Sequence, residues 1–446
     1  MKHYGLTLAA LALVVCSAAR GVTLEEALAR ALENNPQVQQ AQAAVEQAAG
    51  QRLVFRSVAF PTVGLAIIAG AQGGHRAGQG PIEPFAFAQG SLRQPLFRAE
   101  IPASLRRGEI EPLRAAQQLN VVVAEQLHEV RVAFYTALYE RSLETLGRSQ
   151  RRRLDANIAS EEARYEAGTV DRGTLAAATL QARELDPQIE EAHRAYGAAL
   201  LQLATAMGAN LGPGAALPSP EGTLDFIPVD LSVETETAAA LEQRPDLRLA
   251  RLLVRAARQE TRIAEAGYYP RLDLTLFGRY IPVTNIRQAS SGSAQRSDDI
   301  VSSEVAAGAG FTWRVIDNGK VSGAVLRQRS LGEINQLQLK KLEASVGREL
   351  RALQNNLRAI TARHTSLVKA VGVAENNVDV VEKSWQEGLA SQLEFRTAET
   401  GLLVTRRGIL SAAFEEQIAL AAWDRATGRY FQFSDAPGAN VHISQP

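Results

Sequence analysis

Hydrophobic and polar positions along this 446-residue chain follow a helical period over most of its length. The first helical run starts at Thr23, with Glu26 at capping-box spacing, and is predicted to continue to about Arg56. Its apolar face begins with Leu24, Ala27, Leu28, Ala31 and Leu32. Two much longer runs extend over 103–167 and 319–387. At 1.5 Å per residue, each predicts a helix of roughly 100 Å, longer than a globular domain of this size needs.

Two segments, 62–96 and 271–315, follow a strand period instead, and each is predicted to form a β-hairpin around a loop rich in Gly or Ser. The alternation is clearest in the second hairpin, where apolar side chains alternate with polar ones in the run Leu272, Asp273, Leu274, Thr275, Leu276. Strands of about ten residues with one apolar face are typical of an outer-membrane barrel. A soluble β-hairpin has a similar local pattern, so the strands alone leave both interpretations open.

The chain contains the same arrangement twice. Its landmarks recur in one order: Pro36, Pro61, Gly168 and Gly208 in the first half, then Pro245, Pro270, Gly388 and Gly428 in the second. The spacing between the two prolines is identical in both halves, and so is the spacing between the two glycines. Such a unit is too long for a solenoid repeat of roughly 20–50 residues, so it indicates a duplicated structural half.

The duplication defines the predicted organisation of the chain. Its parts are a signal peptide at 1–19, a first repeat at 20–208, an irregular connector at 209–231, a second repeat at 232–428 and an irregular tail at 429–446. The helix that follows Gly168 has small and apolar residues at coiled-coil spacing, which lets neighbouring helices approach closely. Pro187 is expected to kink this helix, and the second repeat has no proline at the matching place.

The N-terminus predicts export. Lys2 and His3 precede the uncharged segment 6–15, and small residues at 17–19 form a cleavage site. The apolar segment is too short for a transmembrane anchor, which needs about 20 residues. Cys16 is the only cysteine, so a mature chain without it has no disulfide or cysteine nucleophile. Acylation of Cys16 as a lipoprotein is the alternative, but Val15 stands where a small residue is expected.

Composition and motifs argue against an enzyme or a nucleic-acid binder. The 48 basic and 48 acidic residues give no net charge, which removes the basic footprint of a nucleic-acid-binding protein. The six histidines show no metal-ligand spacing, and no catalytic constellation or phosphate loop is present. We therefore expect no catalytic residues, no cofactor and no metal site.

The two predicted hairpins supply only four strands. An open four-stranded sheet cannot stand in a bilayer with unpaired edges, and bacterial barrels need at least about eight strands. Several protomers would therefore have to contribute their strands to one closed barrel.

The chain resembles the TolC-like outer-membrane factors over essentially its whole mature length. The resemblance is carried by the proline entries at Pro36 and Pro245, the strand-opening Pro61 and Pro270, Gln94-Pro95-Leu96-Phe97 with its partner 313–319, the turn Arg164-Tyr165-Glu166-Ala167-Gly168 and both terminal glycines. Each motif is weak singly, but their order, repeated twice, is specific. The first half departs from the family at Arg98-Ala99-Glu100, where an Asp-x-Gly corner is usual.

The resemblance implies a mainly α-helical protomer with a duplicated helix–hairpin–helix plan. Three copies would form a twelve-stranded barrel in outer-membrane lipid and a helical tunnel across the periplasm. It implies an exit duct for efflux, fed by an inner-membrane transporter through a periplasmic adaptor. Type I protein secretion and heavy-metal export are alternative systems within the family. A periplasmic coiled-coil adaptor or scaffold is the rival of another class, and the internal duplication disfavours it.

The resemblance also implies two functional regions. Adaptor docking is expected at the tip turns, at Gly168, Thr169, Gly388 and Leu389. A periplasmic constriction is expected one to two turns later, at Glu394 and Thr397, of which only Glu394 is acidic. The matching first-half residue, Thr174, is neutral, so the constriction would differ between halves. The alternative is that Glu394 is an ordinary exposed helix residue that pairs with Arg396 or a neighbouring helix.

Overall fold

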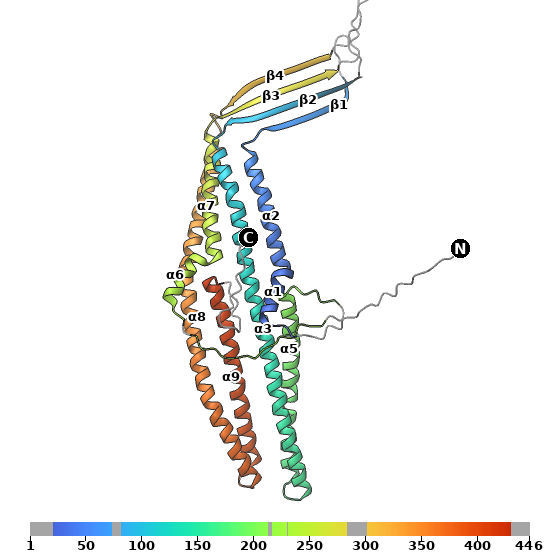
Figure 1. Cartoon of the computed structure of the whole chain (residues 1–446), viewed down its shortest axis with the longest axis vertical. Coiled ribbons are helices and arrows are strands. Elements are labelled where there is room, and N and C mark those ends of the chain that lie inside the picture. Colours follow the sequence, from blue (N-terminus) through green and yellow to red (C-terminus); the bar gives the residue numbers. More distant parts are fainter. Residues whose placement is uncertain (1–20, 74–81, 213–215, 230, 283–300, 430–446) are drawn as a thin grey trace, which may run out of the picture. The chain divides into compact units, whose positions relative to one another are not determined.

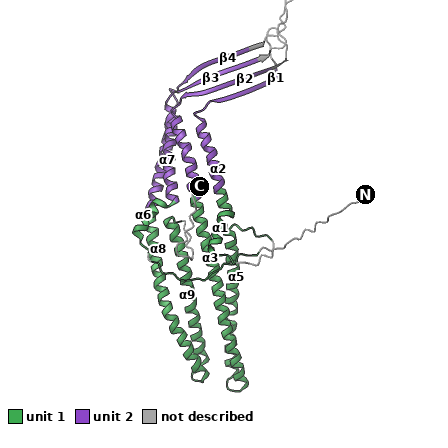
Figure 2. Cartoon of the chain, viewed as in Figure 1, with its two compact units in different colours: residues 1–40, 120–244, 344–446 green, residues 41–119, 245–343 purple. Residues whose placement is uncertain are grey.

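The structure is a computed structural model that describes residues 21–73, 82–212, 216–229, 231–282 and 301–429. The predicted signal peptide, Cys16 and all but the first residue of the predicted C-terminal tail lie outside the described residues. The chain has two compact units, coloured in Figure 2. Unit 1 comprises 1–40, 120–244 and 344–446, and unit 2 comprises 41–119 and 245–343, so each unit takes segments from both predicted repeats.

Each half opens with two helices separated by one residue: α1 (Leu24–Asn34) and α2 (Pro36–Ser57), then α6 (Val233–Gln243) and α7 (Pro245–Glu265). Proline is tolerated at the first position of a helix, but it pushes the preceding residue out of the helical region. Asn35 and Arg244 accordingly have ψ of 123° and 124°. The single run predicted from Thr23 to Arg56 was therefore wrong at Asn35, where it breaks into two helices.

Both predicted hairpins are present in unit 2 (Figure 1). Their strands are β1 (Thr62–Gly73), β2 (Ile82–Phe97), β3 (Arg271–Pro282) and β4 (Val301–Thr312), and the short η1 (Ala266–Tyr268) precedes β3. The four strands pair antiparallel in the order β1-β2-β3-β4, with one irregularity between Pro95 and Phe97. Proline has no amide hydrogen to donate to the ladder, which accounts for the irregularity there.

The strand register separates an apolar face of the sheet from a polar one. Pairing of Leu65 with Gly90, Leu92 with Leu276, and Leu276 with Ala307 places these residues on one face. The opposite face carries the polar pairs Gln89–Arg279, Arg93–Thr275 and Arg279–Glu304. Val63, Leu65 and Ile67 on the apolar face are each at least three-quarters exposed. A sheet so divided suits lipid on one side and water on the other.

The long predicted runs are the helices α3 (Ile101–Glu166) and α8 (Lys320–Gln386), of 66 and 67 residues. The start of α8 is fixed by Asp317, whose carboxylate accepts from the backbone amides of Gly319 (3.1 Å) and Val321 (2.7 Å). Asn318 and Gly319 there have φ of 52° and 84°, a conformation that Asn and Gly adopt at least cost. Arg98 lies at the matching corner of the first half and instead pairs through two nitrogens with Asp273, both at 2.9 Å.

The return helices differ between the halves. The first half has α4 (Arg172–Arg183) and α5 (Asp186–Ala206), whereas the second has one helix, α9 (Gln392–Thr427). Pro187 lies in the first turn of α5, so the predicted kink is instead a break between two helices. Leu185, in the break, is buried against Leu154 and Ala182.

The cores of both units are assembled from small and aliphatic side chains. One cluster of unit 1 includes Leu28, Val130, Phe134 and Leu203, from α1, α3 and α5. In unit 2, Ile110 of α3 packs on Leu252 and Ala256 of α7. Fully buried alanines such as Ala31 and Ala133 lie among these contacts. They permit the close helix packing that the sequence predicts.

Candidate functional site

The first tip turn connects α3 to α4. Gly168 has φ of +74°, a left-handed conformation that glycine adopts without a Cβ clash. Its amide donates to the carbonyl of Tyr165 (2.9 Å), and the amide of Thr169 donates to that of Arg164 (2.9 Å). The next helix is capped by Asp171, whose carboxylate accepts from the amide of Thr174 (2.9 Å). These short-range bonds define the turn completely.

The second tip turn, between α8 and α9, repeats this geometry. Gly388 has φ of +75°, and the amide of Leu389 donates to the carbonyl of Ser384 (2.7 Å). Ser391 caps α9 and forms a capping box with Glu394. Leu389 is 79 % exposed at the apex. Both turns therefore present a small exposed surface with a fixed backbone, and adaptor docking there stays a prediction.

The carboxylate of Glu394 is occupied within its own turn. It accepts from the amide of Ser391 (2.7 Å) and from its hydroxyl (2.9 Å), and these bonds hold the pKa of Glu394 below its usual value. Its expected alternative partner, Arg396, pairs instead with Glu184 (2.6 Å). Thr397 is exposed, and its hydroxyl donates to the carbonyl of Leu393 (2.8 Å). A constriction that combines copies of Glu394 and Thr397 stays a prediction.

Polar contacts link the two helical hairpins within unit 1, and sequence reasoning missed them. Glu399 of α9 is 1 % exposed and accepts from Gln150 and from Arg153 (2.5 Å), both on α3. Nearer the tips, Arg164 of α3 lies 5.1 Å over the ring of Trp385, which stacks on Phe395. The residues that meet here belong to different halves of the chain, so no local spacing could reveal them.

The connector between the halves lies against α8 and α9. The amide of Ile227 donates to Glu416 of α9 (2.8 Å), and the neighbouring Phe226 stacks on His364 of α8 with ring centroids 3.7 Å apart. Gln417 donates to the carbonyl of Asp225 (3.0 Å). Burial raises the pKa of Glu416 from 4.5 to about 7, since the single amide bond compensates only part of the lost hydration.

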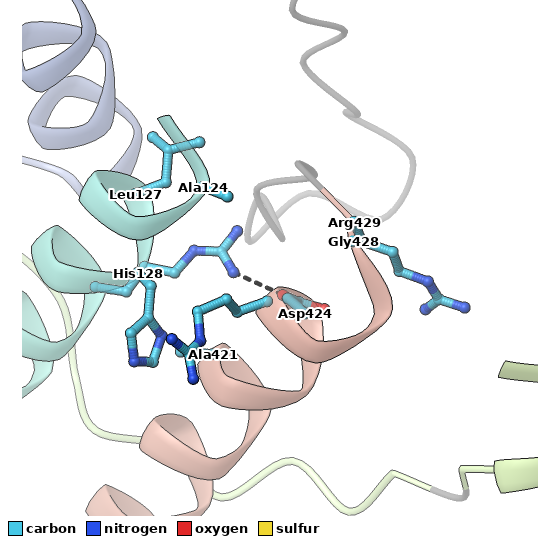
Figure 3. A pocket seen from close by; sticks show the side chains of 9 residues that line it. Ala124, Leu127, His128, Ala421, Asp424, Gly428 and Arg429 are labelled. Atoms are coloured by element: carbon cyan, nitrogen blue, oxygen red, sulfur yellow. Dashed lines mark hydrogen bonds and ion pairs between the residues drawn. The ribbon is translucent and has the colours of Figure 1, made fainter. Parts of the chain in front are cut away.

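A buried ion pair joins α3 to the last turn of α9, beside the hollow shown in Figure 3. Arg131 donates to Asp424 at 2.6 Å, and the two side chains are 8 % and 4 % exposed. Burial nevertheless raises the pKa of Asp424 to about 6, and it lowers the pKa of the adjacent His128. Gly428 closes α9 with φ of +75°.

Within the described ranges, no three His, Cys, Asp or Glu side chains gather as metal ligands do. The described helices include none long and apolar enough to cross a lipid bilayer.

The sequence profile of the family described as outer membrane efflux protein matches residues 27–209 and 238–429. This match covers both repeats and most of the chain. The chain belongs to the outer membrane efflux protein family. As a member, it is an outer-membrane channel that extends into the periplasm and serves efflux.

Solved structures of similar fold include several outer-membrane proteins. The outer membrane protein VceC from Vibrio cholerae is 19 % identical, with a TM-score of 0.76 over 91 % of this chain and 96 % of VceC. The CmeC outer membrane channel of Campylobacter jejuni is 14 % identical, with a TM-score of 0.78 over 93 % and 87 %. The MtrE outer membrane channel of Neisseria gonorrhoeae, solved in an open state, is 17 % identical, with a TM-score of 0.73 over 91 % and 88 %. No curated protein sequence matches this efflux protein.

Proposed function

We propose that this efflux protein is the passive exit duct of a tripartite system and has no enzymatic activity of its own. Three copies assemble around one axis, and their twelve strands close one barrel. Substrate arrives from an inner-membrane transporter through a periplasmic adaptor that contacts the tip turns. Glu394 and Thr397 line the periplasmic constriction.

One observation carries this proposal. The described sheet has an apolar and a polar face, but its edge strands β1 and β4 have no partner strand among the described residues. Unpaired backbone groups are too costly in hydrocarbon for such a sheet to stand alone in a membrane. Pairing β4 of one copy with β1 of the next satisfies both edges, and three copies give a twelve-stranded closed wall.

The assembly is tested by fractionation and cross-linking. We expect heat-modifiable trimers in the outer-membrane fraction, and cysteine pairs placed in β1 and β4 should cross-link between copies. Recovery of the protein only as a soluble periplasmic monomer would contradict the exit-duct proposal and favour an adaptor or scaffold.

The docking role is tested by substitutions at the two tip glycines. These separate the effect of a large side chain on docking from the effect of backbone strain at positive φ. Gly168→Trp or Gly388→Trp places a large side chain on the exposed turn, and we expect normal trimers but loss of export, measured as sensitivity of cells to a pump substrate. Gly388→Asn is the matched control, because Asn tolerates positive φ and adds little bulk. Normal export by both Trp variants would refute docking at the turns.

A further inference from the structure

Helix α7 carries a stripe of arginines on one face. Residues three and four apart on a helix are neighbours, and this spacing alternates through Arg248, Arg251, Arg255, Arg258 and Arg262. Arg251 pairs with Glu343 at 3.4 Å. In the part of the chain that the structure describes, Arg255, Arg258 and Arg262 are exposed and form no ion pair. Their charges are therefore available to an anion from outside the chain.

The stripe borders a hollow between α7 and α3. Arg106 and Glu109 of α3 face the same space as Arg255, Arg258 and Arg262, and the hollow encloses about 770 Å³, part of it open solvent. Four guanidinium groups and one carboxylate, that of Glu109, thus line one space, and positive charge is in excess. A ligand that fits it carries negative charge.

The hollow opens on the less crowded side of the α3–α7 seam. Arg107 and Glu111 lie on the other side, paired with each other and, through Arg107, with Glu260 at 2.7 Å; their side chains are only 13 % and 6 % exposed. A helical wall that curves around a lumen crowds its concave side and opens its convex side. The Arg106 side, where Leu113 is 51 % exposed, is the more open side of this seam, and the proposal below takes it as the outer surface of the wall.

The end of the hollow at Arg106 and Arg262 lies near the junction between the helices and the strands. Exposed aromatic side chains gather where the strands meet the helices: Phe60, Phe97, Tyr268, Tyr269 and Trp313. Aromatic belts of this kind mark the membrane–water interface. Arg262 precedes the aromatic residue Tyr268 by six residues, which is about 9 Å at the rise of a helix. Arg106 is equally close to the strands, as the sixth residue of α3. Long arginine side chains reach from such positions toward headgroups.

We propose that this hollow binds the headgroup of an anionic phospholipid from the periplasmic leaflet, of the phosphatidylglycerol type. The phosphodiester accepts hydrogen bonds from Arg106 and Arg262, and guanidinium groups suit phosphate geometry. Arg255 and Arg258 lie one to two turns deeper, add to the positive potential, and attract the anionic leaflet at a distance limited by salt screening. A zwitterionic choline headgroup lacks the net negative charge.

The test uses the purified full-length protein and the triple variant Arg106→Gln/Arg258→Gln/Arg262→Gln. Its control, Arg348→Gln/Arg351→Gln/Arg358→Gln, removes the same charge from exposed arginines of α8 in unit 1. Binding of short-chain phosphatidylglycerol, short-chain phosphatidylcholine and inorganic phosphate is measured by titration in neutral detergent. We expect the wild type and the control to prefer phosphatidylglycerol over phosphatidylcholine at least tenfold, and the hollow variant to lose that preference.

Several outcomes would overturn the proposal. These are equal binding of the two lipids by the wild type, an undiminished preference in the hollow variant, an equal loss in the control, and binding of inorganic phosphate as tight as that of phosphatidylglycerol. Single-channel conductance in planar bilayers tests the position of the hollow. It should be unchanged in the hollow variant, and altered ion selectivity would place these arginines in the lumen and refute lipid binding.

Discussion

Glu416 offers a direct test of how the connector is held on the second hairpin. The Glu416→Gln substitution removes a negative charge from a side chain that is 2 % exposed. Its amide oxygen can still accept from the amide of Ile227, which Glu416 does at 2.8 Å. The change therefore separates the cost of burying the charge from the value of the hydrogen bond.

The magnitude follows from the pKa of Glu416, which burial raises from 4.5 to about 7. Below pH 4.5 the carboxyl is protonated in both the folded and the unfolded chain, so it carries no ionisation penalty. Between pH 4.5 and 7 the unfolded chain releases the proton first, and the stability of the folded state falls. Above pH 7 the penalty is constant, at about 3 kcal/mol for a shift of this size. Glu416→Gln should thus stabilise the protein at pH 8 and change little at pH 4.5.

Thermal unfolding of the purified protein in detergent, followed by circular dichroism at pH 4.5 and pH 8, measures this difference. We expect the variant to melt a few °C above the wild type at pH 8 and at nearly the same temperature at pH 4.5. The exposed carboxylate Glu33 provides the control, since Glu33→Gln should shift neither melt. A variant that loses more stability at pH 8 than at pH 4.5, relative to the wild type, would show that the charged form is favoured in the fold, contrary to this reasoning.

Three further predictions concern the buried pair, one glycine and the constriction. Arg131→Met leaves Asp424 buried without its cation and should lower the free energy of unfolding by about 3–5 kcal/mol at pH 8. The loss in Tm should shrink below pH 6, where Asp424 is protonated. An equal loss in Tm at both pH values would contradict this prediction. Gly208→Ala should lower the free energy of unfolding by more than about 1 kcal/mol, because φ is +69° and the added Cβ would lie 2.5 Å from the carbonyl oxygen of Asn34. The control Gly197→Ala lies in the middle of α5, where no atom is within reach of the added Cβ, and it should be neutral or stabilising in the same melts. Glu394→Gln should lower cation selectivity and weaken block by multivalent cations in planar bilayers; unchanged selectivity and block would leave Glu394 with its capping role alone.

Features defined by local chemistry could be predicted from the sequence. Gly168 and Gly388 are both left-handed residues at tip turns, as their place after a long helical run indicates. The alternation around Leu274 correctly separates the two faces of β3. These predictions succeeded because turn conformation and strand alternation depend on residues only a few positions apart.

Features that depend on distant segments could not be predicted. Asp424 and Arg131 are 293 positions apart in the chain, and Glu416 meets Ile227 across 189. Nothing near Glu416 or Glu399 in the sequence distinguishes either from Glu394, an exposed glutamate of the same helix. Burial of a charged side chain depends on which helix packs against it, and only the assembled structure contains that information.

The fixed geometry of the tip turns has a consequence for the entropy of association. A disordered loop loses about 1–2 kcal/mol of backbone freedom for each residue that becomes fixed on binding. At Gly168 and Gly388 that freedom is already restricted on folding, by hydrogen bonds within each turn and by the caps at Asp171 and Ser391. A partner that meets these turns therefore has little ordering cost to overcome, so even a small contact area can support association. Removing the side-chain cap at Ser391 should consequently weaken such an association, even where Ser391 itself does not touch the partner.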